Sequence, residues 1–186
     1  MQERTTSHQP LLSLRKIAIT GTLAAVAVLL GITRWGFIPV PNITGSATIM
    51  HVPAILGGVL EGPLVGAMIG TIFGSFSFLQ ATSPLFKHPL VSIFPRIWIG
   101  VVAYYAYALT RTRLGEIRAL ALAGVLGSLT NTTLVLGMAV FVRLLPPAAI
   151  PPIIPQAIAE FIIAAIITVG VAVVWKRIET DGGSSV

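Results

Sequence analysis

The sequence predicts an all-α integral membrane protein: a bundle of six transmembrane helices with the N- and C-termini in the cytoplasm. Of its 186 residues, 55% are hydrophobic and only 10% are charged, and the mean hydropathy is +0.92. Apolar runs of roughly twenty residues recur along the chain, which is the length that a helix needs to cross about 30 Å of hydrocarbon. At that depth each backbone N–H and C=O group must be bonded within its own segment, so these runs are expected to be helices.

Glycine, proline and charged residues divide the apolar sequence into segments. The membrane domain is expected to span residues 17–176, between polar cytoplasmic tails at 1–16 and 177–186. Its six helices are expected at about 17–33, 47–60, 64–79, 90–109, 120–142 and 156–175. The second helix is short and contains Pro53, and interrupted helices of this kind often form membrane binding sites. In the third helix, Gly66, Gly70 and Gly74 recur at every fourth residue, which favours close helix contact within the bundle, with dimer formation as the alternative.

The positive residues determine the expected orientation, because Lys and Arg gather in cytoplasmic loops. A cytoplasmic N-terminus places Arg4, Arg15, Lys16, Arg111, Arg113, Arg118, Lys176 and Arg177 inside, against Arg34, Lys87, Arg96 and Arg143 at the outer side. Loops 34–46, 80–89 and 143–155 then lie outside, together with the outer ends of the helices. These loops and helix ends are expected to form a pocket open to the exterior.

Several function classes are excluded or disfavoured by what the sequence lacks. The chain has no cysteine, which excludes disulfides, thiolate metal sites and a cysteine nucleophile. Its net charge of +6 is attributed to anchoring of cytoplasmic loops at the lipid surface, so a nucleic-acid partner is not expected. There is no GxxxxGK[ST] phosphate loop, so the chain is not expected to use a nucleotide itself, and any step that consumes energy would depend on another subunit. No cofactor or metal is expected.

The candidate substrate-binding residues are polar or aromatic side chains of the outer half. They are Trp35, His51, Gln80, Arg96, Asn131, Gln156 and Glu160. Polar groups at membrane depth are costly and usually face a cavity or a partner. Arg96 follows Pro95 near the start of its helix, where its donors could hold a carboxylate, although it could instead pair with Glu160 or reach the headgroups. Gln156 and Glu160 share a helix face, and His51 could equally bond a carbonyl one turn away.

A strip of small residues follows one face of the first helix. Gly21 and Ala25 lie one turn apart, and Ala24 lies beside them. Such small-xxx-small spacing lets a second helix approach closely, either within the bundle or in a partner protein.

Three stretches of the chain resemble a known family. The small-residue strip, the run ATIMHVPAILGGVLEGPLVGAMIG (47–70) and the run FPRIWIGVVAYYAYAL (94–109) are similar to the substrate-binding S components of energy-coupling factor (ECF) vitamin transporters. Among these, the sequence looks most like the pantothenate-type branch, to which pyridoxine-type members also belong. The resemblance covers about residues 17–176.

The resemblance implies a function that the residues alone do not give. S components lie in the plasma membrane of prokaryotes and capture a vitamin at the outer face. They then work with a transmembrane coupling protein and two cytoplasmic ATPases. The coupling protein would contact the strip of Gly21, Ala24 and Ala25, where the family has an alanine-xxx-alanine pattern. Pantothenate, with a carboxylate, hydroxyls and an amide, would match Arg96, Asn131, Gln156 and Trp35. Neutralisation of Arg96 by Glu160 would favour a neutral vitamin such as pyridoxine.

The sequence gives less support to two other classes of protein. A membrane-embedded hydrolase would need a nucleophile such as Ser75 with His51 or His88, but Ser75 lacks a nucleophile-elbow pattern and the histidines lack HExxH-like spacing. The chain is therefore not expected to be an enzyme. A stand-alone membrane carrier is the remaining alternative, and co-purification with ATPase subunits would separate it from an S component.

Overall fold

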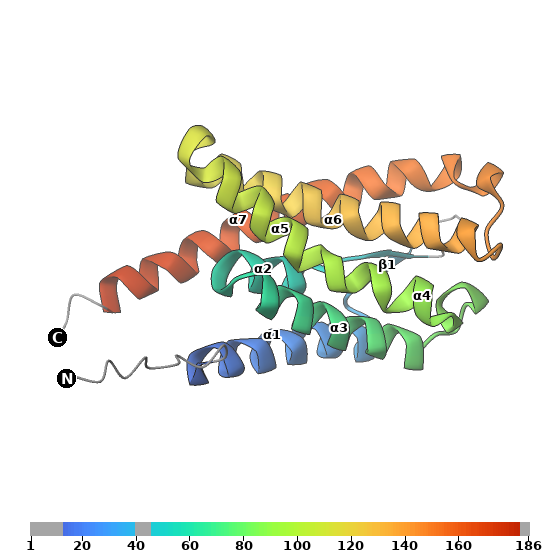
Figure 1. Ribbon diagram of the computed structural model, residues 1–186, viewed down its shortest axis with the longest axis horizontal. Helices are drawn as coiled ribbons and strands as arrows, with labels where there is room; N and C mark the ends of the chain where they lie inside the picture. The colour runs from blue at the N-terminus through green and yellow to red at the C-terminus, as the bar shows by residue number, and fades with distance from the viewer. Residues whose placement is uncertain (1–12, 40–45, 183–186) are drawn as a thin grey trace, which may run out of the picture.

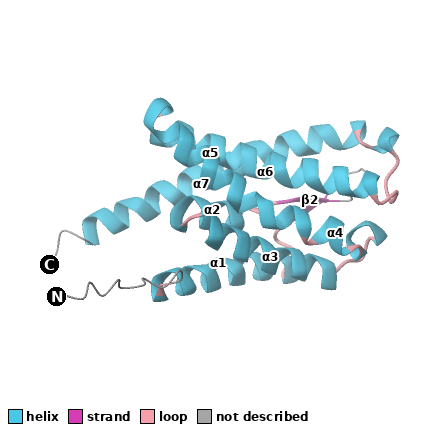
Figure 2. Ribbon diagram, in the orientation of Figure 1, coloured by secondary structure: helices cyan, strands magenta, loops and turns pink. Residues whose placement is uncertain are grey.

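The computed structural model describes residues 13–39 and 46–182, and within these ranges it is almost wholly helical. The longer helices are α1 (Leu14–Ile32), α2 (Val52–Glu61), α3 (Pro63–Leu79), α5 (Phe94–Leu114), α6 (Glu116–Phe141) and α7 (Ile154–Gly182) (Figure 1). The shorter elements are α4 (Pro89–Ser92), the 3-10 helices η1 (Pro84–Lys87), η2 (Pro147–Ala149) and η3 (Pro151–Ile153), and the strands β1 (Phe37–Pro39) and β2 (Ser46–Thr48) (Figure 2). The expected all-α class is confirmed.

The long helices run side by side along one axis of the molecule. The first residues of α1, the turn between α5 and α6, and the last residues of α7 lie at one end of the bundle, here called the termini end (Figure 1). The opposite end is here called the loop end. Four segments of the described chain are long and apolar enough to cross a membrane: α1, α4 with α5, α6, and α7 with the turns before it. The remaining two helices, α2 and α3, are apolar but have only 10 and 17 residues.

Two expected helices differ from those observed. The stretch 47–60 was expected to be helical throughout, but its first residues form β2, and α2 begins only at Val52. β2 pairs antiparallel with β1, which lies between α1 and β2 in the chain, and Ile38 of β1 lies opposite Ala47 of β2. Pro53 lies in the first turn of α2, where a residue without an N–H costs no helical hydrogen bond. The stretch 90–109 is likewise divided at Ile93 into α4 and α5.

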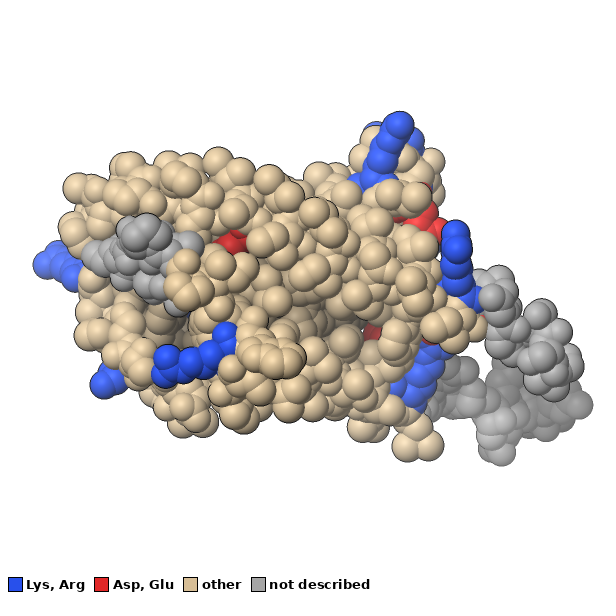
Figure 3. Space-filling model, turned by 180° about the vertical axis from the view of Figure 1, so that it is seen from behind, with Lys and Arg blue, Asp and Glu red and all other residues tan. Residues whose placement is uncertain are grey.

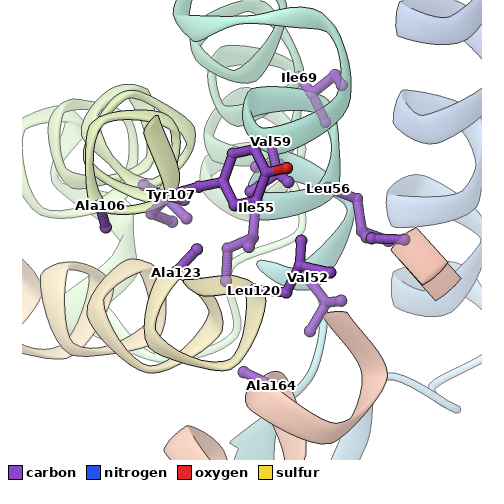
Figure 4. Packing of buried hydrophobic residues seen from close by; sticks show 14 of the residues in the cluster. Val52, Ile55, Leu56, Val59, Ile69, Ala106, Tyr107, Leu120, Ala123 and Ala164 are labelled. Carbon is purple, nitrogen blue, oxygen red and sulfur yellow. The ribbon is translucent and has the colours of Figure 1, made fainter. Parts of the chain in front are cut away.

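The core is organised around α2, whose residues from Val52 to Val59 are all buried. Side chains of α2 pack among residues of α3, α5, α6 and α7, including Ile69, Leu120 and Ala164 (Figure 4). The expected turn after α2 is present, and Gly62 adopts a φ of 108° there, a conformation that glycine reaches without steric cost. Because other helices cover it on all sides, α2 forms the centre of the bundle, although it is shorter than α1, α3, α5, α6 and α7.

The glycine row of α3 is filled by α5 within the same chain. A Cβ added to Gly66 would lie 2.8 Å from the Cα of Gly100, and one added to Gly58 of α2 would lie 2.1 Å from the carbonyl oxygen of Gly100. Three helix backbones therefore meet at these three glycines without side chains between them. The expected close contact is intramolecular, so the row does not need a dimer to explain it.

On the face that Figure 3 shows, lysine and arginine side chains gather toward the two ends of the bundle, with a mostly uncharged band between them. At the termini end, Arg15 pairs with Glu61 at 2.8 Å and also with Glu179, and Lys176 pairs with Glu116 at 2.6 Å. These pairs connect α1 to the α2–α3 turn and to α7, and α7 to α6. The uncharged band is the surface that suits lipid hydrocarbon.

Candidate functional site

A cavity of about 470 Å³ lies at the loop end, where the last turns of α1 and α3 meet the first turns of α5 and α7. A volume of this size suits a small organic ligand. Its polar or charged lining residues are Arg34, Thr48, Ser77, Gln80, Thr82, Ser83, Arg96, Asn131, Thr132, Gln156 and Glu160. Aromatic rings of Phe37, Phe73, Phe76 and Phe86 form much of the remaining wall.

Arg96 is the buried cation of the cavity. Its side chain is only 4% exposed, although it lies in the first turn of α5. One terminal nitrogen, Nη1, donates to the carbonyl oxygen of Val91. That carbonyl is available because Pro95, four residues later, has no N–H with which to continue the helical ladder. The sequence pair Pro95-Arg96 thus provides both the free acceptor and the cation that uses it.

Two aromatic rings flank the guanidinium of Arg96. The centroids of Phe73 and Phe86 lie 5.5 and 5.3 Å from its central carbon, within the range of cation–π attraction. Its Nε has no hydrogen-bond partner among the described residues. A buried guanidinium with an unused donor favours an anionic or carbonyl group of a ligand, because an unmade hydrogen bond at such depth is costly.

The glycine row of α3 determines how close Arg96 comes to that helix. A Cβ on Gly70 would lie 2.0 Å from the carbonyl oxygen of Arg96, and one on Gly74 would lie 3.3 Å from its Cβ. The backbone of Arg96 therefore rests directly on the backbone of α3. Any side chain at Gly70 or Gly74 would displace the start of α5 and the guanidinium with it.

Glu160 is the carboxylate of the cavity and also joins two elements. It is 5% exposed, and its Oε1 accepts hydrogen bonds from the backbone N–H of Thr48 at 2.9 Å and from Nε2 of Gln156 at 3.0 Å. The expected i, i+4 pairing on α7 is thus present, and the contact with Thr48 ties β2 to α7. Among the described residues, no ion pair forms between Glu160 and Arg96. The cavity therefore presents a cation and an anion that are not in contact with each other.

Asn131 provides an acceptor on the α6 wall. It is 5% exposed, and its Oδ1 has no hydrogen-bond partner among the described residues. An amide oxygen buried in this way is a natural partner for a hydroxyl or amide N–H of a ligand.

The structure brings together five of the seven predicted residues: Gln80, Arg96, Asn131, Gln156 and Glu160 all line the cavity. The other two lie outside its lining. Trp35 is 82% exposed at the end of the bundle, and His51 is fully buried just before α2, with neither ring nitrogen bonded within the described part of the chain. The carbonyl bond considered for His51 is therefore not formed.

Several lining residues were not predicted. Arg34 was assigned only to the outer loop, Thr48 to a helix, and Phe73 and Phe86 to no role. Phe73 lies in an apolar helix, where the sequence does not distinguish an aromatic residue that faces a cavity from one that faces lipid. Arg34, by contrast, could have been found as the charged residue that directly follows the first helix.

The small-residue strip of α1 is divided between two faces. Gly21 and Ala25 are exposed, and a Cβ at Gly21 would meet nothing within 4 Å, whereas Ala24 is 5% exposed and packs inward. The surface that remains open for a second helix is therefore that of Gly21 and Ala25. In the described residues no group of three or more His, Asp or Glu side chains could hold a metal ion.

Comparison with known proteins identifies the family. A model of the family described as ECF transporter, substrate-specific component, matches residues 15–172. The chain belongs to this family. Such S components are transport proteins, so the chain is a membrane protein of a non-enzymatic class.

Two individual proteins extend this comparison. The pantothenic acid transporter PanT of Lactococcus lactis subsp. cremoris (strain MG1363) is 28% identical over 140 residues, which cover 64% of this chain and 69% of that protein. A solved structure described as "Structure and mechanism of the S component of a bacterial ECF transporter" matches with a TM-score of 0.64 at 18% identity, and covers 89% of this chain and 96% of that one. The structural match shows that this S component has the fold of its family.

Proposed function

We propose that this S component captures pantothenate at the outer face of a prokaryotic plasma membrane, with Arg96 holding the carboxylate. The single observation that carries the proposal is the state of Arg96: 4% exposed, on a cavity wall, with an unused donor and no ion pair to Glu160 in the described structure. The similarity to PanT, described as a pantothenic acid transporter, supports the same substrate.

Pantothenate offers groups that complement the rest of the lining. Its hydroxyls and amide N–H can donate to the open Oδ1 of Asn131 and to the carboxylate of Glu160. Its aliphatic parts can contact the aromatic wall. Pyridoxine is a weaker candidate, because the Arg96–Glu160 pair that would favour a neutral vitamin is absent from the described residues.

The orientation follows from the distribution of charge. The termini end carries Arg15, Lys16, Arg111, Arg113, Arg118, Lys176 and Arg177, whereas the exposed cations of the loop end are Arg34, Lys87 and Arg143, as far as the structure describes the chain. The positive-inside rule then places the termini end in the cytoplasm and the cavity toward the exterior. The exposed face of Gly21 and Ala25 would receive the transmembrane coupling protein, and two ATPases would supply energy.

Calorimetry on the full chain in nanodiscs tests the proposed substrate. Pantothenate is compared with panthenol, in which an alcohol replaces the carboxylate, and with pyridoxine. A hydrogen bond to a charged group is worth about 1.5–3 kcal/mol, so panthenol should bind about 10 to 150 times more weakly than pantothenate. Arg96→Gln should abolish most of this difference. Tight binding of pyridoxine without binding of pantothenate would refute the proposal, as would an unchanged preference in the Arg96→Gln protein.

A further inference from the structure

The cavity has a second arginine in its wall. Arg34 follows Thr33, the C-cap residue of α1, and lines the cavity, but unlike Arg96 it is exposed. Two positive side chains therefore belong to one cavity, one reachable from solvent and one buried beside Phe73 and Phe86. An exposed and a buried cation act on an anion at different stages, because the field of the exposed one extends into the solvent.

The backbone holds Arg34 in an unusual conformation. Its φ is +60°, in the left-handed region that residues other than glycine seldom adopt. Hydrogen bonds fix this turn on both sides: the N–H of Arg34 donates to Gly31, the N–H of Gly36 donates to Leu30, and the N–H of Phe37 donates to the carbonyl of Arg34. A left-handed residue just past a helix end is a common way for a helix to terminate, so the turn fixes the position of Arg34 but does not by itself mark a functional residue.

Arg143 provides an internal comparison. It has the same φ of +60°, is also exposed, and lies at the loop end of α6, but it does not line the cavity. The left-handed turn is therefore not what distinguishes Arg34. What distinguishes Arg34 is its place in the cavity wall.

We propose that Arg34 is a capture residue, which accelerates the association of the anionic vitamin from the exterior before Arg96 holds it in the cavity. This inference rests on the proposed function, since it requires an anionic substrate. A charge at the rim of a binding site changes the association rate and its salt dependence, whereas a desolvated charge chiefly changes the dissociation rate. Arg34 and Arg96 should therefore differ in the kinetic step that each controls.

Stopped-flow tryptophan fluorescence on the full chain, in nanodiscs of uncharged lipid, tests this inference. The probes are pantothenate and panthenol, each measured at several salt concentrations. Asn tolerates a left-handed φ, so Arg34→Asn removes the charge and preserves the turn. We expect it to lower the pantothenate association rate by up to about tenfold at low salt, to reduce the salt dependence, and to leave the dissociation rate and the rate for panthenol unchanged.

Two further variants complete the experiment. Arg34→Lys should keep most of the parental association rate, because it keeps the charge, and Arg143→Asn should behave as the parent does. Parental association rates and salt dependence in Arg34→Asn would overturn the role of Arg34 and leave pantothenate as the substrate. An equal loss in Arg143→Asn would also overturn it, because the effect would then be one of net charge. Absence of pantothenate binding to the parent would overturn the proposed substrate and this role together.

Discussion

The contact between α3 and the backbone of Arg96 gives a sharp prediction for Gly70→Ala. The new Cβ would lie 2.0 Å from the carbonyl oxygen of Arg96, whereas ordinary contacts begin at 3.4 Å, so the two helices must separate by about 1.4 Å. The obstacle is backbone, which cannot rotate away as a side chain can. The guanidinium would move with its helix and lose its alignment with a bound carboxylate. Loss of that charge-assisted bond corresponds to a dissociation constant about 10 to 150 times larger.

The assay is calorimetric titration of pantothenate into the purified variant, with thermal unfolding measured in parallel. Overpacking of a tight contact should also lower the free energy of unfolding by about 1–3 kcal/mol. Gly137→Ala is the matched control, because a Cβ at Gly137 of α6 meets nothing within 4 Å. If Gly70→Ala binds pantothenate and unfolds as the parent does, the glycine row does not position Arg96 and the reasoning is refuted.

Three other substitutions test the open face of α1, its buried face and the contact between Glu160 and Thr48. Gly21→Leu, on the open face of α1, should preserve pantothenate binding but abolish uptake in cells that carry an ECF module, and unchanged uptake would argue against docking there. Ala24→Leu, on the buried face, should instead lower the free energy of unfolding by about 1–3 kcal/mol through overpacking. Glu160→Leu should destabilise the protein by about 1–3 kcal/mol, because the N–H of Thr48 loses its acceptor, and an unchanged unfolding midpoint would show that water replaces the carboxylate there.

The helical part of the fold was largely predictable from the sequence. A long apolar run in lipid has few structural solutions, and the spacing of Gly66, Gly70 and Gly74 favoured a close helix contact, which the structure has. What the spacing could not show was the partner of that face. The partner proved to be α5 and the residues just before it: Gly66 meets Gly100, Gly70 meets the backbone of Arg96, and Gly74 meets Ser92 and Ile93.

The strand pair was not predictable, because its two strands have only three residues each. Nothing in the run Ser46–Thr48 resembles a strand more than a helix, and its conformation depends on a tertiary contact, that of Thr48 with Glu160 of α7. The site was predicted better than the strands, because a polar side chain in an apolar chain is itself a signal. Trp35 did not fit that logic, since an amphipathic ring suits the membrane interface as well as a ligand.

The two aromatic rings beside Arg96 affect the free-energy cost of releasing a bound ligand. A buried cation without a partner is unfavourable, so it would favour the bound state of an anionic ligand and slow the release of that ligand. The cation–π contacts with Phe73 and Phe86 and the hydrogen bond to the Val91 carbonyl stabilise the guanidinium even without a ligand. If Arg96 holds the substrate as proposed, these contacts make its unliganded state less unfavourable and so lower the free-energy cost of releasing the substrate.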